Sequence, residues 1–139
     1  MLRFRLLFII IFSMVVNSCS VSQKTSSQTS VIGPWTIETA KGVSVSAGME
    51  QAALTLDSDG KMHGNTSINR FFGSYKTEGH KLRLDNEGMT RMMGPHPEIE
   101  DAVLDAINQV DYYSFQTDGK LLLLNQSGEV VMTLNRVSK

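Results

Sequence analysis

The sequence predicts a β-rich α+β fold, in which an antiparallel sheet forms a barrel-like structure or a curled meander with one amphipathic helix at about residues 97–110. Short runs of β-favouring residues recur along the chain, and glycines suited to tight turns separate them. One segment instead has the apolar spacing of a helix. Many short strands interrupted once by a helix favour a curled antiparallel sheet. The turn glycines are Gly60, Gly79, Gly119 and Gly128.

The first predicted strands lie between residues 35 and 65. Residues 35–40 alternate behind a Gly-Pro break, and Trp35 is expected to anchor the core rather than serve as a binding platform, because its large apolar area is hard to leave exposed. Residues 52–56 and 61–65 flank Asp57-Ser58-Asp59-Gly60, which is typical of a hairpin turn. The same turn resembles part of a calcium loop, but the remaining ligands of an EF-hand are missing, so the hairpin is favoured.

A second hairpin is predicted from residues 70–77 and 80–85, because apolar and polar residues alternate on both sides of Glu78-Gly79. A loop through Glu87-Gly88 should then lead to a methionine cluster. We expect Met89, Met92 and Met93 to fill the core rather than form a metal or redox site, since flexible thioethers pack well into irregular gaps.

The helix is predicted where apolar residues recur at three and four residue spacing after Pro97, a residue suited to the first turn. Acidic residues in that turn complement the positive end of the helix dipole, so they are better explained by capping than by a metal site. Three strands should follow, at residues 112–116, 120–125 and 129–135, as a meander. The apolar positions of the helix are Ile99, Ala102, Val103, Ala106, Ile107 and Val110.

Residues 1–18 are predicted to be a lipoprotein signal peptide. Two arginines precede an apolar run that is too short for a spanning helix, and the run ends in Val16-Asn17-Ser18-Cys19. This ending resembles the bacterial lipobox, although Asn17 stands where a smaller residue is usual. Cys19, the only cysteine, is therefore the predicted lipidation site, where attached acyl chains (palmitate among them) would give stable anchoring. A signal cleaved elsewhere and a soluble secreted product is the alternative.

Residues 19–31 are expected to be a lipidated N-terminus followed by a flexible tether, because they are rich in Ser, Thr and Gln and lack apolar periodicity. The folded domain should span residues 32–139. This organisation predicts a lipid-anchored protein of the bacterial cell envelope, at the outer membrane, on its periplasmic side or its surface. Removing residues 1–18 takes away two arginines and no acids, so the net charge falls from −1 to −3. A mildly acidic domain does not favour nucleic acid as a partner.

No catalytic or metal-binding pattern stands out in the sequence. The three histidines, His63, His80 and His96, lack the close spacing that would put two ligands on one face. A nucleophile elbow and a phosphate-binding loop are absent as well. We therefore expect no catalytic residue, no metal and no cofactor.

The folded part resembles the META/HslJ family of small bacterial domains over about residues 34–136. The resemblance rests on Trp35 near the start, on Asn69-Arg70-Phe71-Phe72-Gly73-Ser74-Tyr75, on Thr90-Arg91-Met92, and on Glu100 in the following helix. The order and spacing of these pieces agree with the family pattern. The resemblance implies a β-rich, barrel-like domain with one helix, found in envelope lipoproteins with links to stress tolerance or secretion, and without established catalytic residues.

These motif residues are expected to be structural rather than a ligand surface. Strand alternation places Phe71 and Tyr75 on one face and Phe72 on the other, and Asn69 is expected to bond its own turn. Two departures matter, because the family's Gly-Cys pair before the asparagine is here Ser67-Ile68 and a later cysteine is Gly94. If those cysteines lie close together in the family, Ile68 would fill the space by apolar packing.

The sequence favours a non-enzymatic, lipid-anchored envelope protein whose META-like domain binds a protein partner or supports envelope stress tolerance. The alternative is a small periplasmic inhibitor or a ligand-binding β-barrel, with loops near Gly88 or Pro95 as the contact. That alternative requires either an apolar pocket or a protruding exposed loop. A hydrolase would require a nucleophile beside a base in a cleft, and we expect none.

Overall fold

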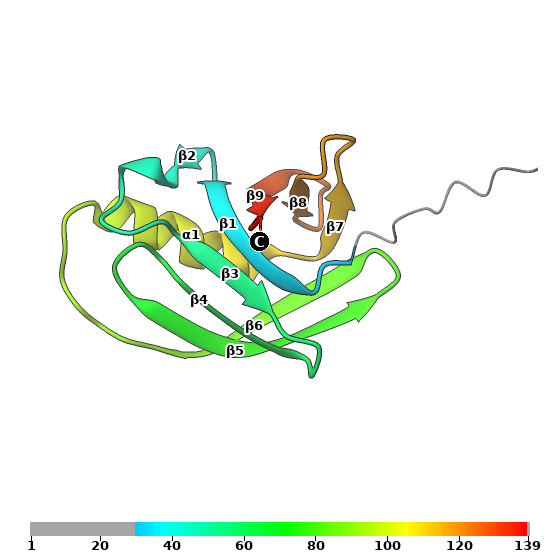
Figure 1. Cartoon of the computed structure of the whole chain (residues 1–139), viewed down its shortest axis with the longest axis horizontal. Coiled ribbons are helices and arrows are strands. Elements are labelled where there is room, and N and C mark those ends of the chain that lie inside the picture. Colours follow the sequence, from blue (N-terminus) through cyan, green and yellow to red (C-terminus); the bar gives the residue numbers. More distant parts are fainter. Residues whose placement is uncertain (1–29, 139) are drawn as a thin grey trace, which may run out of the picture.

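Nine strands and one α-helix form the part of the chain that the computed structural model describes, residues 30–138 (Figure 1). The helix, α1, spans Pro97–Gln109 and lies between β6 and β7, and a 3₁₀ turn at Val45–Ala47 follows β2. The strands are β1 (Gly33–Ala40), β2 (Val43–Ser44), β3 (Ala53–Leu56), β4 (Lys61–Asn65), β5 (Arg70–Glu78), β6 (Lys81–Met89), β7 (Tyr112–Phe115), β8 (Leu121–Leu124) and β9 (Val130–Arg136).

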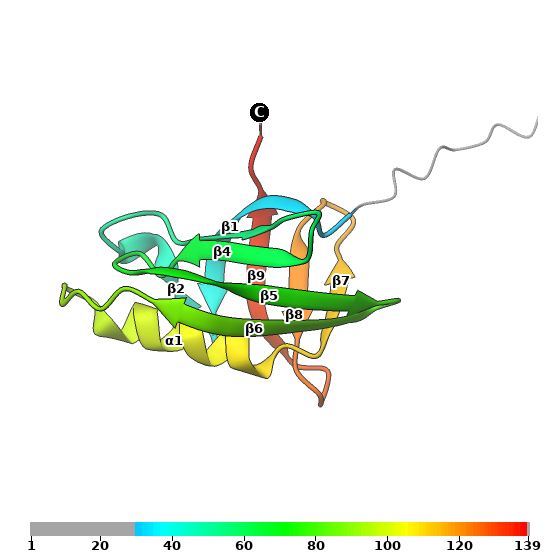
Figure 2. The same ribbon diagram turned by 90° about the horizontal axis from the view of Figure 1, so that it is seen from below.

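The strands form one antiparallel sheet that curls into a ring. Neighbours pair in the order β2-β1-β3-β4-β5-β6-β7-β8-β9, and β1 also pairs with β9, which closes the ring. Between β6 and β7 the ladder is reduced to the pair of Lys81 with Tyr112. The helix α1 packs against β6, β1 and β9, and runs alongside β6 in Figure 2. The predicted β-rich fold with a curled sheet and a single helix is confirmed.

The interior of the ring is filled by side chains. Each fully buried aliphatic or aromatic residue contributes about 1.5–3 kcal/mol relative to an exposed one, so this interior is the main source of stability. The helix adds its own apolar stripe, Ile99, Ala102, Val103, Ala106 and Ile107, as its spacing predicts. The largest fully buried side chains are Trp35, Ile37, Leu54, Leu56, Met62, Phe71, Leu82, Ile99, Ile107, Leu121, Leu123 and Met132.

The strand β6 is longer than the sequence predicts. A loop was expected at Glu87-Gly88, but β6 continues to Met89 and pairs Gly88 with Phe72 of β5. The Phe72 ring lies over this glycine, since a Cβ on Gly88 would be 2.6 Å from Phe72 Cζ. An aromatic ring that covers a cross-strand glycine supplies the packing that glycine lacks. The short strand β2 was not predicted at all.

The prediction that the methionine cluster fills the core is wrong for two of its three members. Met89 packs partly buried against the core, but the side chains of Met92 and Met93 are exposed, with relative accessibilities of 60% and 103%. The strand β6 ends at Met89, so strand alternation does not turn every second side chain inwards in the loop that follows. The loop of residues 90–96 between β6 and α1 is therefore a surface feature.

Within residues 30–138, no helix is both long and apolar enough to cross a membrane. Among the described residues, Val31 is already buried, one residue before the predicted domain boundary at residue 32. The predicted signal peptide, residues 1–18, and the predicted lipidation site, Cys19, lie outside the described residues.

Candidate functional site

Asn69 is almost fully buried, with 1% of its surface exposed, at the end of the tight connection between β4 and β5. This connection is closed by Thr66, whose backbone N–H donates to Asn69 O at 2.8 Å and whose Oγ1 accepts from Asn69 N at 3.1 Å. The sequence predicts that the Asn69 side chain bonds its own turn. This prediction is wrong, because Thr66 closes the turn and the Asn69 amide bonds other segments of the chain.

The Asn69 side chain joins the connection to the loop of residues 90–96 and to α1. Its Oδ1 accepts from the backbone N–H of Met92 at 2.7 Å and from Thr90 Oγ1 at 3.0 Å. Its Nδ2 donates to Met92 O at 3.0 Å and to Glu100 Oε2 at 2.7 Å. A side-chain amide has two donor hydrogens and two acceptor lone pairs. All four are used.

The other members of this arrangement are tied to neighbouring elements. Thr90 Oγ1 accepts from Arg70 N at 3.0 Å, and Thr90 N donates to Arg70 O at 2.9 Å, which continues the pairing of β5 and β6 beyond Met89. Glu100, in the first turn of α1, also accepts from Thr66 Oγ1 at 3.4 Å. We call Thr66, Asn69, Thr90, Met92 and Glu100 the Asn69 network.

The Asn69 network fixes the loop of residues 90–96 between the sheet and the helix. Hydrogen bonds that are shielded from water and connected to one another are stronger than isolated surface bonds. The bond from Asn69 to the Glu100 carboxylate is charge-assisted and short. The network gathers four of the motif residues predicted from sequence, Asn69, Thr90, Met92 and Glu100, although two of its bonds span 23 and 31 positions of the chain.

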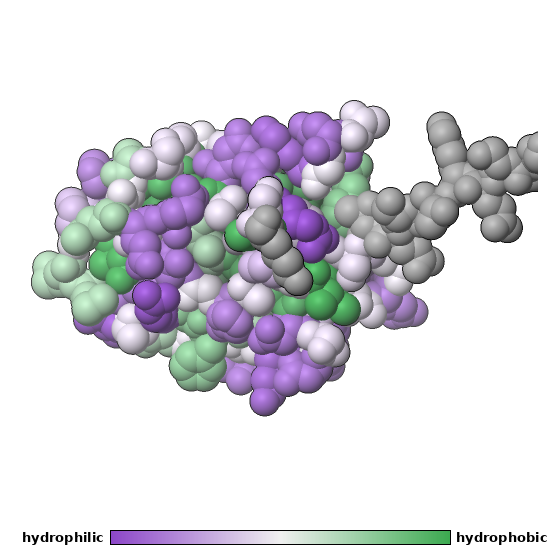
Figure 3. Space-filling model, viewed as in Figure 1, coloured by the Kyte–Doolittle hydropathy of each residue, from purple (hydrophilic) through white to green (hydrophobic). Residues whose placement is uncertain are grey.

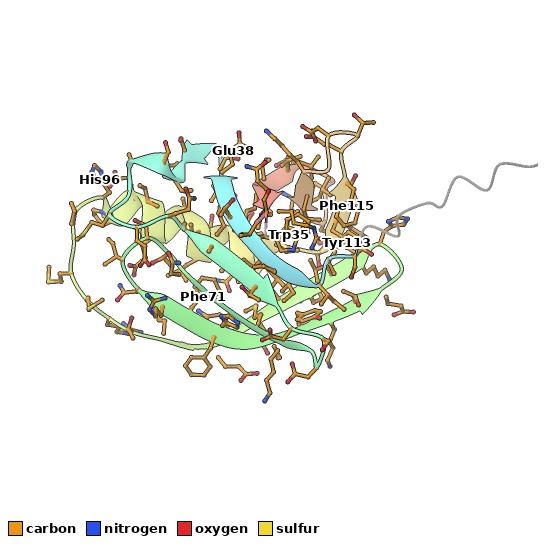
Figure 4. The ribbon with its side chains drawn as sticks, in the orientation of Figure 1. Trp35, Glu38, Phe71, His96, Tyr113 and Phe115 are labelled. Atoms are coloured by element: carbon orange, nitrogen blue, oxygen red, sulfur yellow. The ribbon has the colours of Figure 1, made fainter. Side chains whose placement is uncertain are left out.

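Trp35 lies at the other end of the molecule, in a cluster of aromatic side chains. Figure 4 shows Trp35 beside Phe115 and Tyr113, far from His96. Trp35 is fully buried, and its Nε1 donates to Val31 O at 2.8 Å. The Arg136 guanidinium lies over its ring, 4.0 Å from the centroid, in cation–π geometry. The expectation of a core anchor is confirmed for Trp35, whereas no signal in the sequence singled out Arg136.

The aromatic run follows strand alternation along β5. Phe71 is buried and covers Gly64 of β4, Phe72 is 57% exposed, and Tyr75 is half-buried. Gly73 is required by close packing, because a Cβ there would lie 1.8 Å from Asp85 O, at the bulge where the register of β5 and β6 shifts.

Tyr75 is held by its phenol group rather than by the Asn69 network. Its hydroxyl donates to Asp57 O in the β3–β4 turn, and its backbone N–H donates to Gly60 O at 2.9 Å. Burial raises the pKa of the Tyr75 phenol above its ordinary value, and the nearby carboxylates of Asp57 and Asp59 raise it further. The side chain therefore stays neutral and keeps its hydrogen bond.

The two departures from the family pattern lie next to each other. A Cβ on Gly94 would be 3.1 to 3.3 Å from three side-chain carbons of Ile68, so these positions are in contact, and the half-buried Ile68 side chain packs beside Gly94. Ser67 has a φ of +87°, a backbone conformation in which glycine is favoured. Its Oγ is buried without a hydrogen-bond partner in the described part of the chain.

Arg91 does not join the Asn69 network. It is exposed, and among the described residues its side chain has no hydrogen bond or ion pair. The network member that sequence reasoning missed is Thr66. Its position three residues before a buried asparagine is the spacing of a turn closed by a hydroxyl side chain, and this signal could have identified it.

The described residues offer little reactive chemistry. Residues 30–138 contain no group of three His, Cys, Asp or Glu side chains placed to hold a metal ion. The histidines lie apart: His63 is near Asp57, the His80 ring packs at a tilt against Tyr113, and His96 precedes α1 and contacts Glu98. The pKa of Glu98 is lowered because its carboxylate accepts a hydrogen bond from the backbone N–H of Glu98 itself, and a second hydrogen bond from His96 lowers it further. A surface hollow beside Tyr75 and Arg83 has a volume of about 370 Å³.

Comparisons with solved structures agree with the fold. The chain is similar to a protein from Burkholderia xenovorans solved by NMR, with 24% identity, a TM-score of 0.55 and coverage of 77% of this chain and 83% of that one. A second NMR structure gives 18% identity and a TM-score of 0.56 over 74% and 87% of the two chains. A DUF4847 family protein from Bacteroides vulgatus has 14% identity and a TM-score of 0.52, with coverage of 63% of this chain and 60% of that one. No curated protein matches.

The family model described as the META domain matches residues 29–138, a range that includes all of the described residues, 30–138. The match includes both ends of the molecule, the Asn69 network and the Trp35 cluster. The resemblance found from the sequence motifs is thereby confirmed. This chain belongs to the META domain family.

Proposed function

We propose that the protein is a non-enzymatic, lipid-anchored component of the bacterial cell envelope, and that its META domain binds a protein partner. The signal-like residues 1–18 and Cys19 support the anchor. The observation that carries the binding role is the loop of residues 90–96. It exposes two apolar side chains, Met92 and Met93, while the Asn69 network fixes its backbone. Exposed apolar residues gathered on one surface are typical of interaction sites.

The polar side chains of the motif support a structural role rather than catalysis. The Asn69 amide is fully occupied, and Glu100 accepts hydrogen bonds from Asn69 and Thr66. A general base or nucleophile needs a free lone pair directed at a substrate in a cleft. Asn69 has none, and Thr90 uses its hydroxyl to bridge Asn69 and Arg70.

An inhibitor role is the second candidate, and the loop of residues 90–96 is the observation that favours it. The sequence predicts that such a role would use a loop near Gly88 or Pro95. Gly88 instead lies within β6, whereas the loop of residues 90–96 extends beyond the sheet in Figure 1. A ligand held inside the ring is disfavoured, since large buried side chains such as Trp35, Phe71 and Met132 occupy the interior. An inhibitor is also a protein that binds a protein, so the two candidates differ in the consequence for the partner.

The anchor is tested by fractionating cells that express the full chain or its Cys19→Ser variant. The wild-type chain should sediment with membranes and incorporate a clickable palmitate analogue. The Cys19→Ser variant should lose the label and remain an unprocessed precursor or appear in the soluble fraction. The matched control is Ser20→Ala, which leaves the thiol in place and should behave as wild type. An unchanged palmitate label on Cys19→Ser would refute the assignment.

The partner is tested by reversible crosslinking in cells followed by purification of the full chain. A specific protein should be recovered in repeated experiments, and deletion of the gene should sensitise cells to envelope stress. If no protein is enriched over a control lipoprotein and the deletion strain grows normally under detergent or heat stress, the binding role is wrong.

A further inference from the structure

We propose that a groove between the loop of residues 90–96 and the first turn of α1 binds a partner segment in which a lysine or arginine stands beside an aliphatic or aromatic residue. This inference rests on the proposed binding role and specifies where the partner binds and what chemistry it presents. The groove has a volume of about 210 Å³. Its lining includes Ile68, Met92, Met93, Glu100 and Asp101.

One side of the groove is apolar and exposed. Met93 is fully accessible and Met92 is 60% exposed, and Ile68 lines the groove together with them. Methionine is common at protein-binding surfaces because its flexible thioether adapts to different side chains. Figure 3 shows moderately hydrophobic residues at the left end of the molecule, where Figure 1 places this loop.

The backbone that presents these side chains is fixed before any partner binds. Both the N–H and the C=O of Met92 are bonded to the Asn69 amide, at 2.7 and 3.0 Å. The opposite side of the groove is the helix α1, which Glu100 attaches to the same amide. A surface that is already ordered loses little conformational entropy on binding. The Asn69 network therefore sets the width of the groove from both sides.

The other side of the groove is acidic, and its carboxylates form no ion pair within residues 30–138. Asp101 is exposed. Glu100 has its Oε2 bonded to Asn69 and Thr66, while no described group is bonded to Oε1. Both residues lie in the first turns of α1. Charge complementarity thus selects a cationic side chain next to the apolar one.

The acidic side also argues against other occupants. An anionic membrane surface would be repelled by Glu100 and Asp101, as would the anionic end of a nucleotide. A second copy of the chain would bring the same two carboxylates if the contact were symmetric. A basic and apolar segment of another protein satisfies both sides of the groove at once.

The test is photo-crosslinking of the full chain in the cells that produce it. The photoreactive residue p-benzoylphenylalanine replaces Met93 in one strain. In two control strains it replaces Phe72 or Val130, which are exposed hydrophobic residues that do not line the groove. Crosslinked segments are then identified by mass spectrometry, so that the sequence in the groove is read directly.

We expect a crosslink at position 93 to a segment that carries Lys or Arg within a few residues of the attachment point. Adding Asp101→Asn to the same strain should lower the yield by up to about fivefold, since an exposed charge pair contributes up to about 1 kcal/mol and 1.4 kcal/mol is tenfold. The matched control, Glu78→Gln, makes the same charge change at the far hairpin and should leave the yield unchanged. Thermal melting should show that both variants remain folded.

The remaining outcomes separate the groove from the binding role. Crosslinks at Phe72 or Val130 positions but not at 93 would overturn the groove and leave the binding role intact. A crosslink at 93 to a lipid, to another copy of the chain or to a segment without Lys or Arg would overturn the proposed chemistry. If no position yields a crosslinked protein, both the proposed occupant of the groove and the proposed binding role are wrong.

Discussion

The two ends of the molecule are held by different interactions. At one end Trp35 packs against Phe115 and under Arg136, so apolar contact and a cation–π pair dominate. At the other end the Asn69 network joins three segments by directed hydrogen bonds. Packing tolerates small shifts, whereas a fully bonded amide fixes the position of each partner. The comparison indicates that the Trp35 end provides stability and that the Asn69 end provides a defined surface.

The largest effect is expected at the Trp35 end. Trp35→Ala should lower the free energy of unfolding by about 3–5 kcal/mol, the usual cost of removing a buried tryptophan. The indole also supplies the hydrogen bond to Val31 and the face for Arg136, so both are lost. Urea denaturation measures the effect, and Trp35→Phe should cost less because it keeps part of the ring. A loss below about 1 kcal/mol for Trp35→Ala would contradict the assigned role.

A smaller but more local effect is expected from Asn69→Ala. The change leaves Met92 N–H and Glu100 without their partner and should cost about 2–3 kcal/mol, since each unsatisfied buried group costs about 1–3 kcal/mol and water replaces some bonds. Asn125→Ala is the matched control, because Asn125 accepts bonds from the Ser127 and Glu129 N–H groups in an accessible turn. Its cost should stay below about 1 kcal/mol. Equal costs would refute the difference between the two asparagines.

A disulfide should form at the Asn69 end if both family positions are restored. Ile68→Cys with Gly94→Cys places two thiols at positions that are in contact, and the free energy of unfolding should rise by about 2 kcal/mol, the low end for a crosslink that closes a long loop. Non-reducing electrophoresis and melting with and without reductant measure it. Gly94→Cys alone is the control and should show no dependence on reductant. Failure of the double variant to oxidise would mean that the two positions are too far apart.

A stabilising change is expected at Ser67. Ser67→Gly should raise the free energy of unfolding by about 1 kcal/mol, because it relieves the positive φ and removes an unpartnered buried hydroxyl, against the entropy cost of glycine. Ser67→Ala removes the hydroxyl but keeps the side chain at positive φ, so it should gain less. If alanine stabilises as much as glycine, the backbone conformation is not the cause.

The smallest effect is a pH dependence at Tyr75. The pKa of this phenol is raised in the folded state, so its contribution to stability is complete below the unfolded-state pKa of about 10 and is lost as the pH rises through the folded-state value. Wild-type stability should therefore begin to fall above about pH 10. Tyr75→Phe should lack this component, although it is less stable at neutral pH through loss of the bond to Asp57 O. Parallel pH profiles for the two proteins would contradict the assignment.

Much of the fold could be predicted from the sequence because its signals are local. Alternation gives the strands, three and four residue spacing gives α1, and Gly60 does have the positive φ that the turn requires. The end of β6 could not be predicted, because Gly88 is accommodated by the Phe72 ring on another strand. The short strand β2 is too brief to leave a pattern in the sequence.

The candidate site was only partly predictable for the same reason. The motif residues could be named, but the partners of Asn69 are 21 to 31 positions away, and nothing local shows that its amide bonds Met92 and Glu100. The flexible thioether side chains of Met89, Met92 and Met93 predict that these residues belong to the core. The hydrogen bonds to the Met92 backbone instead fix the loop outside the sheet, so Met92 and Met93 face solvent.

The central claim is that the Asn69 amide holds the loop of residues 90–96 in place. Native-state hydrogen exchange at the Met92 amide tests it most directly, because this N–H donates to Asn69 Oδ1 at 2.7 Å. In the wild-type protein the amide should be protected despite the exposure of its side chain. In Asn69→Ala its protection should be lost while that of Leu54 in β3 persists. A wild-type Met92 amide that exchanges as fast as an unstructured peptide would contradict the claim.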